Sequence, residues 1–286
     1  MTGGLGGIFI PKQVVASGSE GKLPSGQAQW AVAARKQLLT DCRRQLFEEY
    51  FPFWENGGID EEQGGFMCYL HEDGTLENDR KDIWYQGRGA WVYAYLYNEI
   101  DPDPKWLKIA GKACAFMSRH MHRGDGTWLD TVDRFGNAVP AIDTDRANNI
   151  YCALFAAAGL IQYARATGNG KELDLAKLSL RKAVEQYEDK DYPGVVVPGT
   201  QETGLRTQGH SFMFVWVIPQ LLQLQPDPWF EEILEEHLDH LNNKFWNPEY
   251  GISNENLFHD YSRIPSESAA MLPGHSIETQ WMCMAE

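Results

Sequence analysis

The stretch of the sequence that decides the fold runs from Lys81 to Tyr97 and reads KDIWYQGRGAWVYAYLY. In a helix its side chains separate into two stripes, because residues three and four positions apart share a face. One stripe is mostly small and apolar and suits packing against a neighbouring helix: Ile83, Gly87, Ala90, Ala94 and Tyr97. The other sets a charge among aromatic rings: Trp84, Arg88, Trp91 and Tyr95. We therefore predict a helix that separates a packed layer from a second environment.

The aromatic stripe has two interpretations. An arginine between three aromatic residues is unusual on a solvent face and costly in a dry core. Arg88 therefore either faces a wet cleft or is a structural arginine, stacked on rings and paired with a carboxylate. We favour the cleft.

A second motif lies near the C-terminal end, where residues 273–281 read PGHSIETQW. The i, i+4 spacing of Ile277 and Trp281 begins a helix after a Pro-Gly loop. His275 and Glu278 then lie on the same side of its first turn. Histidine titrates near neutrality, and a carboxylate within reach can hold it as a base. The alternative is that both residues merely cap the helix.

Helical patterns recur along the rest of the chain, separated by short turns or by longer Gly-rich loops with extended arms. They cover about residues 27–50, 79–98, 105–121, 143–167, 171–189, 206–224, 229–242 and 273 to the end. Nothing alternates strand with helix as a parallel sheet requires. We predict an all-α toroid whose inner helices line a cleft and whose loops form its rim. An irregular all-α domain is the alternative.

Composition narrows the class of protein. The net charge of −15 argues against a nucleic-acid partner, which needs clustered Lys and Arg. Ten Trp and twelve Tyr fill a core or stack on sugar rings. The five cysteines have no metal-site or disulfide spacing and are interpreted as buried thiols of a cytoplasmic protein. Residues 1–25 are expected to form a flexible tail, with neither a signal peptide nor a membrane span, ahead of a barrel domain over 26–286.

Together, K-x-x-W-x-Q-x-R-x-x-W at 81–91 and PGH-x-I-E-x-x-W at 273–281 resemble the N-acylglucosamine 2-epimerase superfamily. That superfamily also holds cellobiose 2-epimerases and aldose–ketose isomerases. The resemblance runs from about residue 27 to the end and implies an (α/α)6 barrel. The chain shows about eight of its helices, so we expect a barrel truncated at its C-terminal side. It also implies an isomerase with a small sugar as its partner, no cofactor and no metal. A homodimer is compatible with the sequence.

The resemblance also implies roles for particular residues. Trp84 and Arg88 would face the sugar, and the Y-x-x-x-F pattern at 151–155 matches the family's substrate-facing tyrosine at Tyr151. The family's N-x-x-x-H becomes Arg206-x-x-x-His210 here, so His210 matches and Arg206 replaces an asparagine. His275 would be one catalytic base, with Glu278 as the carboxylate that orients it. The family's second catalytic histidine has no match in this chain.

The implied reaction removes the proton at C2 of an open-chain aldose, forms a cis-enediolate and returns a proton to the opposite face. Two histidines serve the two faces, and Arg88 stabilises the developing oxyanion. Return of the proton to C1 instead gives the ketose.

Two other functions stay open at this stage. One is an (α/α)6 glycoside hydrolase, which needs two carboxylates, and Glu278 with Asp143 or Asp145 is the available pairing. The other is a non-catalytic carbohydrate-binding or truncated barrel.

Overall fold

The computed structural model describes residues 25–139, 150–193 and 203–285. The predicted tail, apart from Ser25, lies outside these residues, and so do Asp143 and Asp145. Helix α1 begins at Ser25, one residue before the predicted domain boundary.

Helices make up most of the described chain, and several of them end in a π-helical turn. Their bounds are α1 Ser25–Arg44, η1 Gln45–Tyr50, α2 Phe51–Phe53, η2 Trp54–Gly58, α3 Ile83–Tyr95, η3 Leu96–Ile100, α4 Pro104–Phe116, η4 Met117–Met121, α5 Ile150–Thr167, α6 Gly170–Glu188, α7 Gln208–Leu224, α8 Pro228–Asp239, η6 His240–Lys244, η7 Pro265–Glu267 and α9 Pro273–Ala285. If each helix is counted with its π-helical continuation and the short 3-10 helix η7 is left aside, the described residues contain the predicted series of eight. None of the described helices is both long and apolar enough to span a membrane.

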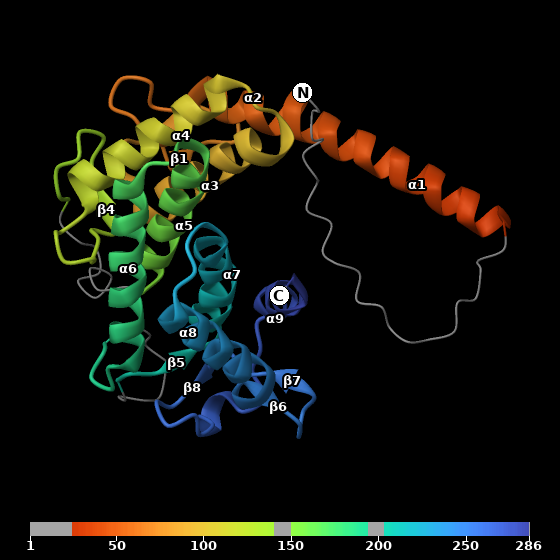
Figure 1. Ribbon diagram of the computed structural model, residues 1–286, viewed down its shortest axis with the longest axis vertical. Coiled ribbons are helices and arrows are strands. Elements are labelled where there is room, and N and C mark those ends of the chain that lie inside the picture. Colours follow the sequence, from red (N-terminus) through yellow and green to blue (C-terminus); the bar gives the residue numbers. More distant parts are fainter. Residues whose placement is uncertain (1–24, 140–149, 194–202, 286) are drawn as a thin grey trace.

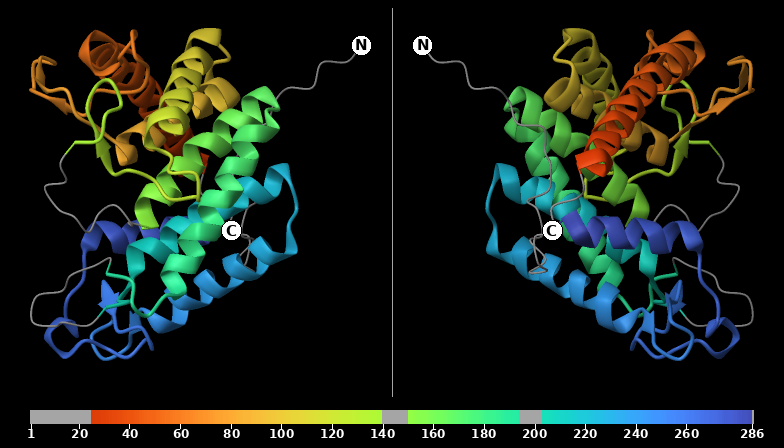
Figure 2. Two further views of the ribbon diagram at one scale, coloured as in Figure 1. Left: turned by 90° about the vertical axis from the view of Figure 1, so that its left-hand side faces the viewer. Right: turned by 90° about the vertical axis from the view of Figure 1, so that its right-hand side faces the viewer.

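The helices form two layers. In the inner layer α3 packs on α5, α5 on α7, and α7 on α9, while α4, α6 and α8 lie behind α3, α5 and α7 respectively. Figure 1 shows α1 projecting from the body, and the views in Figure 2 show α9 lying across α7. This alternation of inner and outer helices is the predicted α/α toroid.

The inner helices approach closely where the sequence places glycine. A Cβ on Gly87 would lie 2.2 Å from the carbonyl oxygen of Phe155, and one on Gly159 would lie 2.7 Å from the carbonyl oxygen of Gly87. The predicted small, apolar stripe of α3 therefore packs against α5. A polar clamp joins the same layer, because Gln220 Oε1 on α7 accepts hydrogen bonds from Trp91 Nε1 (2.8 Å) and Gln162 Nε2 (2.7 Å).

The strands are short antiparallel pairs in the loops: β1 (Tyr69–Leu70) with β2 (Leu76–Asn78), β3 (Lys81–Asp82) with β4 (Thr131–Val132), β5 (Arg206–Thr207) with β8 (Asn256–Leu257), and β6 (Trp246–Asn247) with β7 (Ile252–Ser253). Strands β3 and β5 directly precede α3 and α7. The helices expected from about residues 79 and 206 therefore begin at Ile83 and Gln208 instead, because the residues before them pair with loop strands.

A buried ion pair ties three loops together on the α3 side. Lys81 Nζ lies 2.9 Å from Asp60 Oδ2, and both side chains are fully buried. Arg134 adds a second contact to Asp60 at 2.8 Å. These two cations hold the pKa of Asp60 well below its usual range despite its burial. A buried pair of this kind is costly to break, so it fixes the rim from which α3 starts.

The cysteines are all free thiols, as expected from their spacing. Cys114 and Cys152 are buried, whereas Cys42 is exposed on α1. The expectation of buried thiols is therefore wrong for Cys42, because α1 projects from the body (Figure 1), and it is met only in part by Cys68 and Cys283, which are half-buried.

Candidate active site

A cavity of about 590 Å³ lies among the four inner helices. Its walls come from α3 (Trp84, Arg88, Trp91), α5 (Tyr151, Phe155), α7 (Phe212, Met213, Trp216) and α9 (His275, Glu278, Trp281, Met282). We call this cavity the cleft. Aromatic rings dominate its walls, and its charged groups are Arg88, His275 and Glu278. It brings together both motifs of the sequence, which are separated by about two hundred residues along the chain.

Helix α3 supplies the aromatic and cationic wall. The Arg88 guanidinium lies 4.2 Å from the centre of the Phe155 ring, and the Trp84 ring lies 4.9 Å from that of Tyr151. Arg88 makes no ion pair or hydrogen bond with any described residue, and its side chain reaches solvent. The surrounding rings lower its pKa by desolvation, which the charge of Glu278 opposes. The cleft interpretation of the aromatic stripe is therefore confirmed for Trp84, Arg88 and Trp91.

His275 is held by a carboxylate that the sequence did not reveal. Its Nδ1 donates a hydrogen bond to Glu255 Oε1 at 2.8 Å, and this contact raises the pKa of the histidine. The prediction that Glu278 orients His275 is wrong in this respect. Glu278 follows one turn later on α9 and lines the cleft, but it makes no hydrogen bond to the imidazole.

The position of Glu255 follows from strand pairing. Glu255 directly precedes β8, whose residues pair with β5 in the register Thr207 to Asn256. The backbone N–H of Gln208, the first residue of α7, donates to the carbonyl of Glu255 at 2.8 Å. The loop that contains Glu255 is thereby fixed to the start of α7, next to the first turn of α9. No local pattern indicates this contact, since it joins segments twenty residues apart across a loop.

Tyr151 and His210 occupy different depths. The Tyr151 ring lines the cleft, and His210 is buried behind it, with the two ring centres 4.5 Å apart. Burial lowers the pKa of His210 to about 3, so the ring is neutral. Gly209 permits the approach, because a Cβ there would lie 1.9 Å from the Tyr151 hydroxyl and 3.6 Å from His275 Cε1. His210 thus supports the wall that Tyr151 forms.

Arg206 lies apart from the other predicted site residues. It belongs to strand β5 rather than to a helical turn shared with His210, so the two side chains do not share a face. Its guanidinium makes two hydrogen bonds to Glu188, at 2.7 and 3.0 Å, and stacks over the rings of Tyr187 and Tyr261. Arg206 is therefore held by Glu188 and two tyrosine rings, and it does not line the cleft. This arrangement is contrary to its predicted role in substrate binding.

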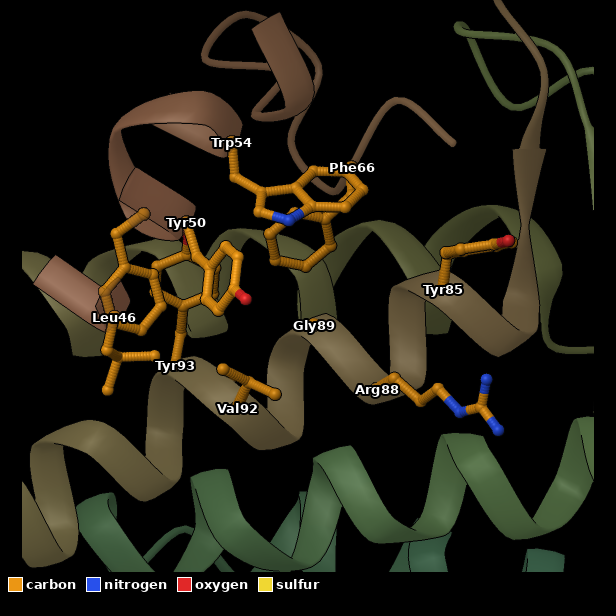
Figure 3. Close-up of a pocket in the computed structure, with 10 residues that line it drawn as sticks. Leu46, Tyr50, Trp54, Phe66, Tyr85, Arg88, Gly89, Val92 and Tyr93 are labelled. Carbon is orange, nitrogen blue, oxygen red and sulfur yellow. The ribbon is translucent and has the colours of Figure 1, made fainter. Parts of the chain in front are cut away.

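A second, smaller hollow of about 310 Å³ adjoins α3 on a neighbouring face. Figure 3 shows its lining, which is Leu46, Tyr50, Phe51, Trp54, Phe66, Tyr85, Arg88, Gly89, Val92 and Tyr93. We call it the groove. In the close-up, Arg88 extends away from the rings of Tyr50, Trp54 and Tyr93, and its head group lies at the far end. Arg88 is the single charged residue of this lining.

Comparison with known proteins connects this geometry to a family. A sequence model described as N-acylglucosamine 2-epimerase matches residues 64–285. The chain belongs to the N-acylglucosamine 2-epimerase family. The matched region contains both motifs and every residue of the cleft. Family membership confirms the resemblance that those motifs carry.

Individual members of the family cover the chain only in part. N-acylglucosamine 2-epimerase of Bos taurus is 37% identical over 70 residues, which are 24% of this chain and 17% of that protein. Cellobiose 2-epimerase of Dictyoglomus turgidum is 26% identical over 155 residues, 53% of this chain and 37% of that protein.

A solved structure extends the likeness to the fold. Cellobiose 2-epimerase of Spirochaeta thermophila is 18% identical to this chain, with a TM-score of 0.74 over 87% of this chain and 63% of that one. The fold is therefore the (α/α)6 barrel, of which the described residues form a part. The chain spans less than two thirds of the length of each of these relatives.

Proposed function

We propose that this chain carries the sugar cleft and one proton-transferring histidine of a sugar 2-epimerase or aldose–ketose isomerase. The observation that carries the proposal is the meeting of Arg88, His275 and Glu278 in one cleft with aromatic walls. The relatives named as 2-epimerases support this reaction class.

Each group of the cleft has a task in that reaction. Neutral His275 takes the proton from C2 of the open-chain aldose, and the electrons of the broken C–H bond form the enediolate. Arg88, with no anionic partner among the described residues, stabilises the charge that develops on the sugar oxygens. The rings of Trp84 and Tyr151 stack on the apolar faces of the sugar. Proton return to the opposite face of C2 gives the epimer, and return to C1 gives the ketose.

The partner of this site is a small neutral sugar. Aromatic rings form most of the cleft wall, and its charged groups are few, which suits a polyhydroxylated, uncharged ligand. With Arg206 outside the cleft and bound to Glu188, the asparagine contact implied by the family has no counterpart at this position. We therefore propose that sugar preference depends on Glu278 and the aromatic wall. We also propose a cytoplasmic location and a homodimer.

The reaction is tested by deuterium incorporation at C2 in heavy water, followed by proton NMR. The sugars are N-acetylmannosamine, mannose, glucose and cellobiose, and circular dichroism first shows that the chain is folded. One base is sufficient for exchange on one face, so we expect exchange with at least one sugar and its loss in His275→Ala. A folded chain that exchanges none of these sugars would contradict the proposal.

A glycoside hydrolase is the alternative from another reaction class. It requires two carboxylates across one cleft, and the partners considered for Glu278, Asp143 and Asp145, lie outside the described residues. The same sugar panel, extended by oligosaccharides, separates the two: release of reducing ends without C2 exchange would identify a hydrolase. Binding of a sugar with neither reaction would identify a carbohydrate-binding barrel.

A further inference from the structure

The carboxylate of Glu255 is set deep beside the cleft, with only 13% of its side chain exposed. One oxygen, Oε1, accepts the hydrogen bond from His275 Nδ1. The other, Oε2, is buried and has no hydrogen-bond partner among the described residues. A buried carboxylate oxygen without a partner is unfavourable, and a cation held against the same group offsets that cost. The position of Glu255 is therefore best explained by its contact with His275.

We propose that Glu255, and not Glu278, is the positioning residue of His275, holding the imidazole with Nδ1 toward the loop and Nε2 toward the substrate. The proposal rests on the proposed function, in which His275 takes a proton from the sugar. It assigns to Glu255 a role that neither motif of the sequence contains.

The direction of proton transfer follows from this arrangement. Because Nδ1 is engaged by Glu255, Nε2 is the ring nitrogen left to meet the sugar. The C2 proton moves to Nε2, and the electron pair of the C–H bond stays on the sugar as the enediolate. The imidazole becomes an imidazolium whose positive charge faces Glu255. Glu255 touches no reacting atom, and the proton stays on the imidazole until it returns to the sugar.

The surroundings of His275 distinguish the two glutamates. From the loop, the facing charge is Glu255, and from α9 itself it is Glu278, whose effect on the histidine pKa is purely coulombic and ranks behind that of Glu255. Helix α7 presents the Phe212 ring, 5.2 Å from the imidazole, and α5 presents Tyr151.

Glu278 thus remains available to the sugar. Its charge is felt by Arg88 across the cleft, and Arg88 itself carries no paired carboxylate among the described residues. Glu278 and Arg88 are therefore placed to bind hydroxyl groups of the substrate, whereas Glu255 acts only through His275.

The test is a pH titration of the histidine rings by nitrogen NMR on the whole chain. The His275 signals are identified by their loss in His275→Gln. In the wild type we expect neutral His275 to carry its proton on Nδ1 and to titrate above the ordinary histidine pKa. Glu255→Gln keeps an acceptor oxygen but removes the charge, so the pKa of His275 should fall. Glu249→Gln, an exposed residue of the nearby turn between β6 and β7, is the matched control and should leave it unchanged.

NMR results of two kinds, one on the wild type and one on the variants, would overturn the proposal. One is a wild-type His275 whose neutral form carries its proton on Nε2, which is readable even if Glu255→Gln does not fold. The other is a folded Glu255→Gln variant with an unchanged His275 pKa, or a larger fall in Glu278→Gln than in Glu255→Gln.

The rate profile provides a second readout that a merely structural role would not move. A base acts when deprotonated, so the acid limb of C2 exchange follows the pKa of His275. Glu255→Gln should therefore shift that limb to lower pH and reduce the plateau rate roughly 10²-fold. Glu255→Asp, which keeps the charge, should restore part of the loss. If the NMR shifts occur but no sugar exchanges, the proposed function fails while the positioning role stands. If Glu255→Gln exchanges the sugar and the acid limb of its pH–rate profile is unchanged, the positioning role is contradicted while the proposed function stands.

Discussion

The cleft and the groove lie on adjacent faces of α3 and share Arg88. Both are walled by aromatic rings, and both are open to solvent. The cleft and the groove differ in the side chains that lie between these aromatic rings. The cleft adds His275 and Glu278 from α9, while the groove adds leucine, valine and tyrosine side chains and no further charge. Aromatic residues at helical spacing therefore predict that a hollow is present, but they do not predict its function.

The difference lies in which element faces α3. Across the cleft stand α7 and α9, whose first turns are tied to the loop that contains Glu255, so His275 arrives at a fixed position. Across the groove stands the helix of η1 and α2, whose side chains toward α3 are apolar. Arg88 shows the consequence, because its head group points away from the rings of the groove (Figure 3). The groove has no group that could move a proton at neutral pH.

The largest effect is expected when a variant in the cleft is compared with one in the groove for C2 exchange. His275→Gln removes the base of the cleft and should lower C2 deuterium exchange by about 10²- to 10⁴-fold. Trp54→Phe makes the groove wider and should keep the rate within about twofold of the wild type, since no charged group is lost. Proton NMR of the exchanging sugar measures both. Equal losses in the two variants would mean that the hollows do not differ in function.

Arg88 is shared, so its replacement tests which hollow uses it. Arg88→Met keeps much of the side-chain length but removes the charge that stabilises the enediolate, and exchange should fall by about 10²- to 10³-fold. Val92→Ser, one turn later on the groove face, is the control. The exchange rate at saturating sugar is the measurement, because a loss confined to the apparent affinity would assign Arg88 to binding alone.

The packed face of α3 is tested through a glycine. In Gly87→Ala the new Cβ would lie 2.2 Å from the backbone carbonyl of Phe155, so α3 and α5 must separate. We expect unfolding in urea at a lower midpoint, with a loss of roughly 1–3 kcal/mol. Gly170→Ala at the start of α6 meets no atom within 4 Å and is the matched control. An unchanged midpoint in Gly87→Ala would show that the inner helices pack less closely than described.

The smallest effect is expected in the groove itself. Val92 is 37% exposed, so Val92→Ser removes apolar atoms that are only partly buried. The free energy of unfolding should fall by about 1 kcal/mol, and C2 exchange should not change. Solubility should rise slightly, because an apolar hollow at the surface favours association. A fall in exchange would connect the groove to the cleft through α3.

Much of the fold and part of the site could be predicted from the sequence. Trp84, Arg88 and Trp91 share a cleft wall because helical periodicity is local, and the first turn of α9 was marked by Pro273 and Gly274 together with the spacing of Ile277 and Trp281. That same spacing did not show burial: Ile277 is 68% and Trp281 46% exposed. Apolar residues at helical spacing predict that a helix forms, whereas the residues that cover its apolar face depend on the rest of the molecule.

The sequence by itself determined the helical series and the two stripes of α3, since each depends on residues a few positions apart, whereas the expectation that Arg88 and His275 share one site came from the resemblance of the two motifs to the family. Only the tertiary structure decided which carboxylate holds His275. The hydrogen bond to Glu255 requires β5 to pair with β8, which brings together segments about fifty residues apart. The same pairing placed Arg206 in a strand, where it binds Glu188 instead of the cleft. Contacts made across strand pairs have no local period, and so no spacing in the sequence reveals them.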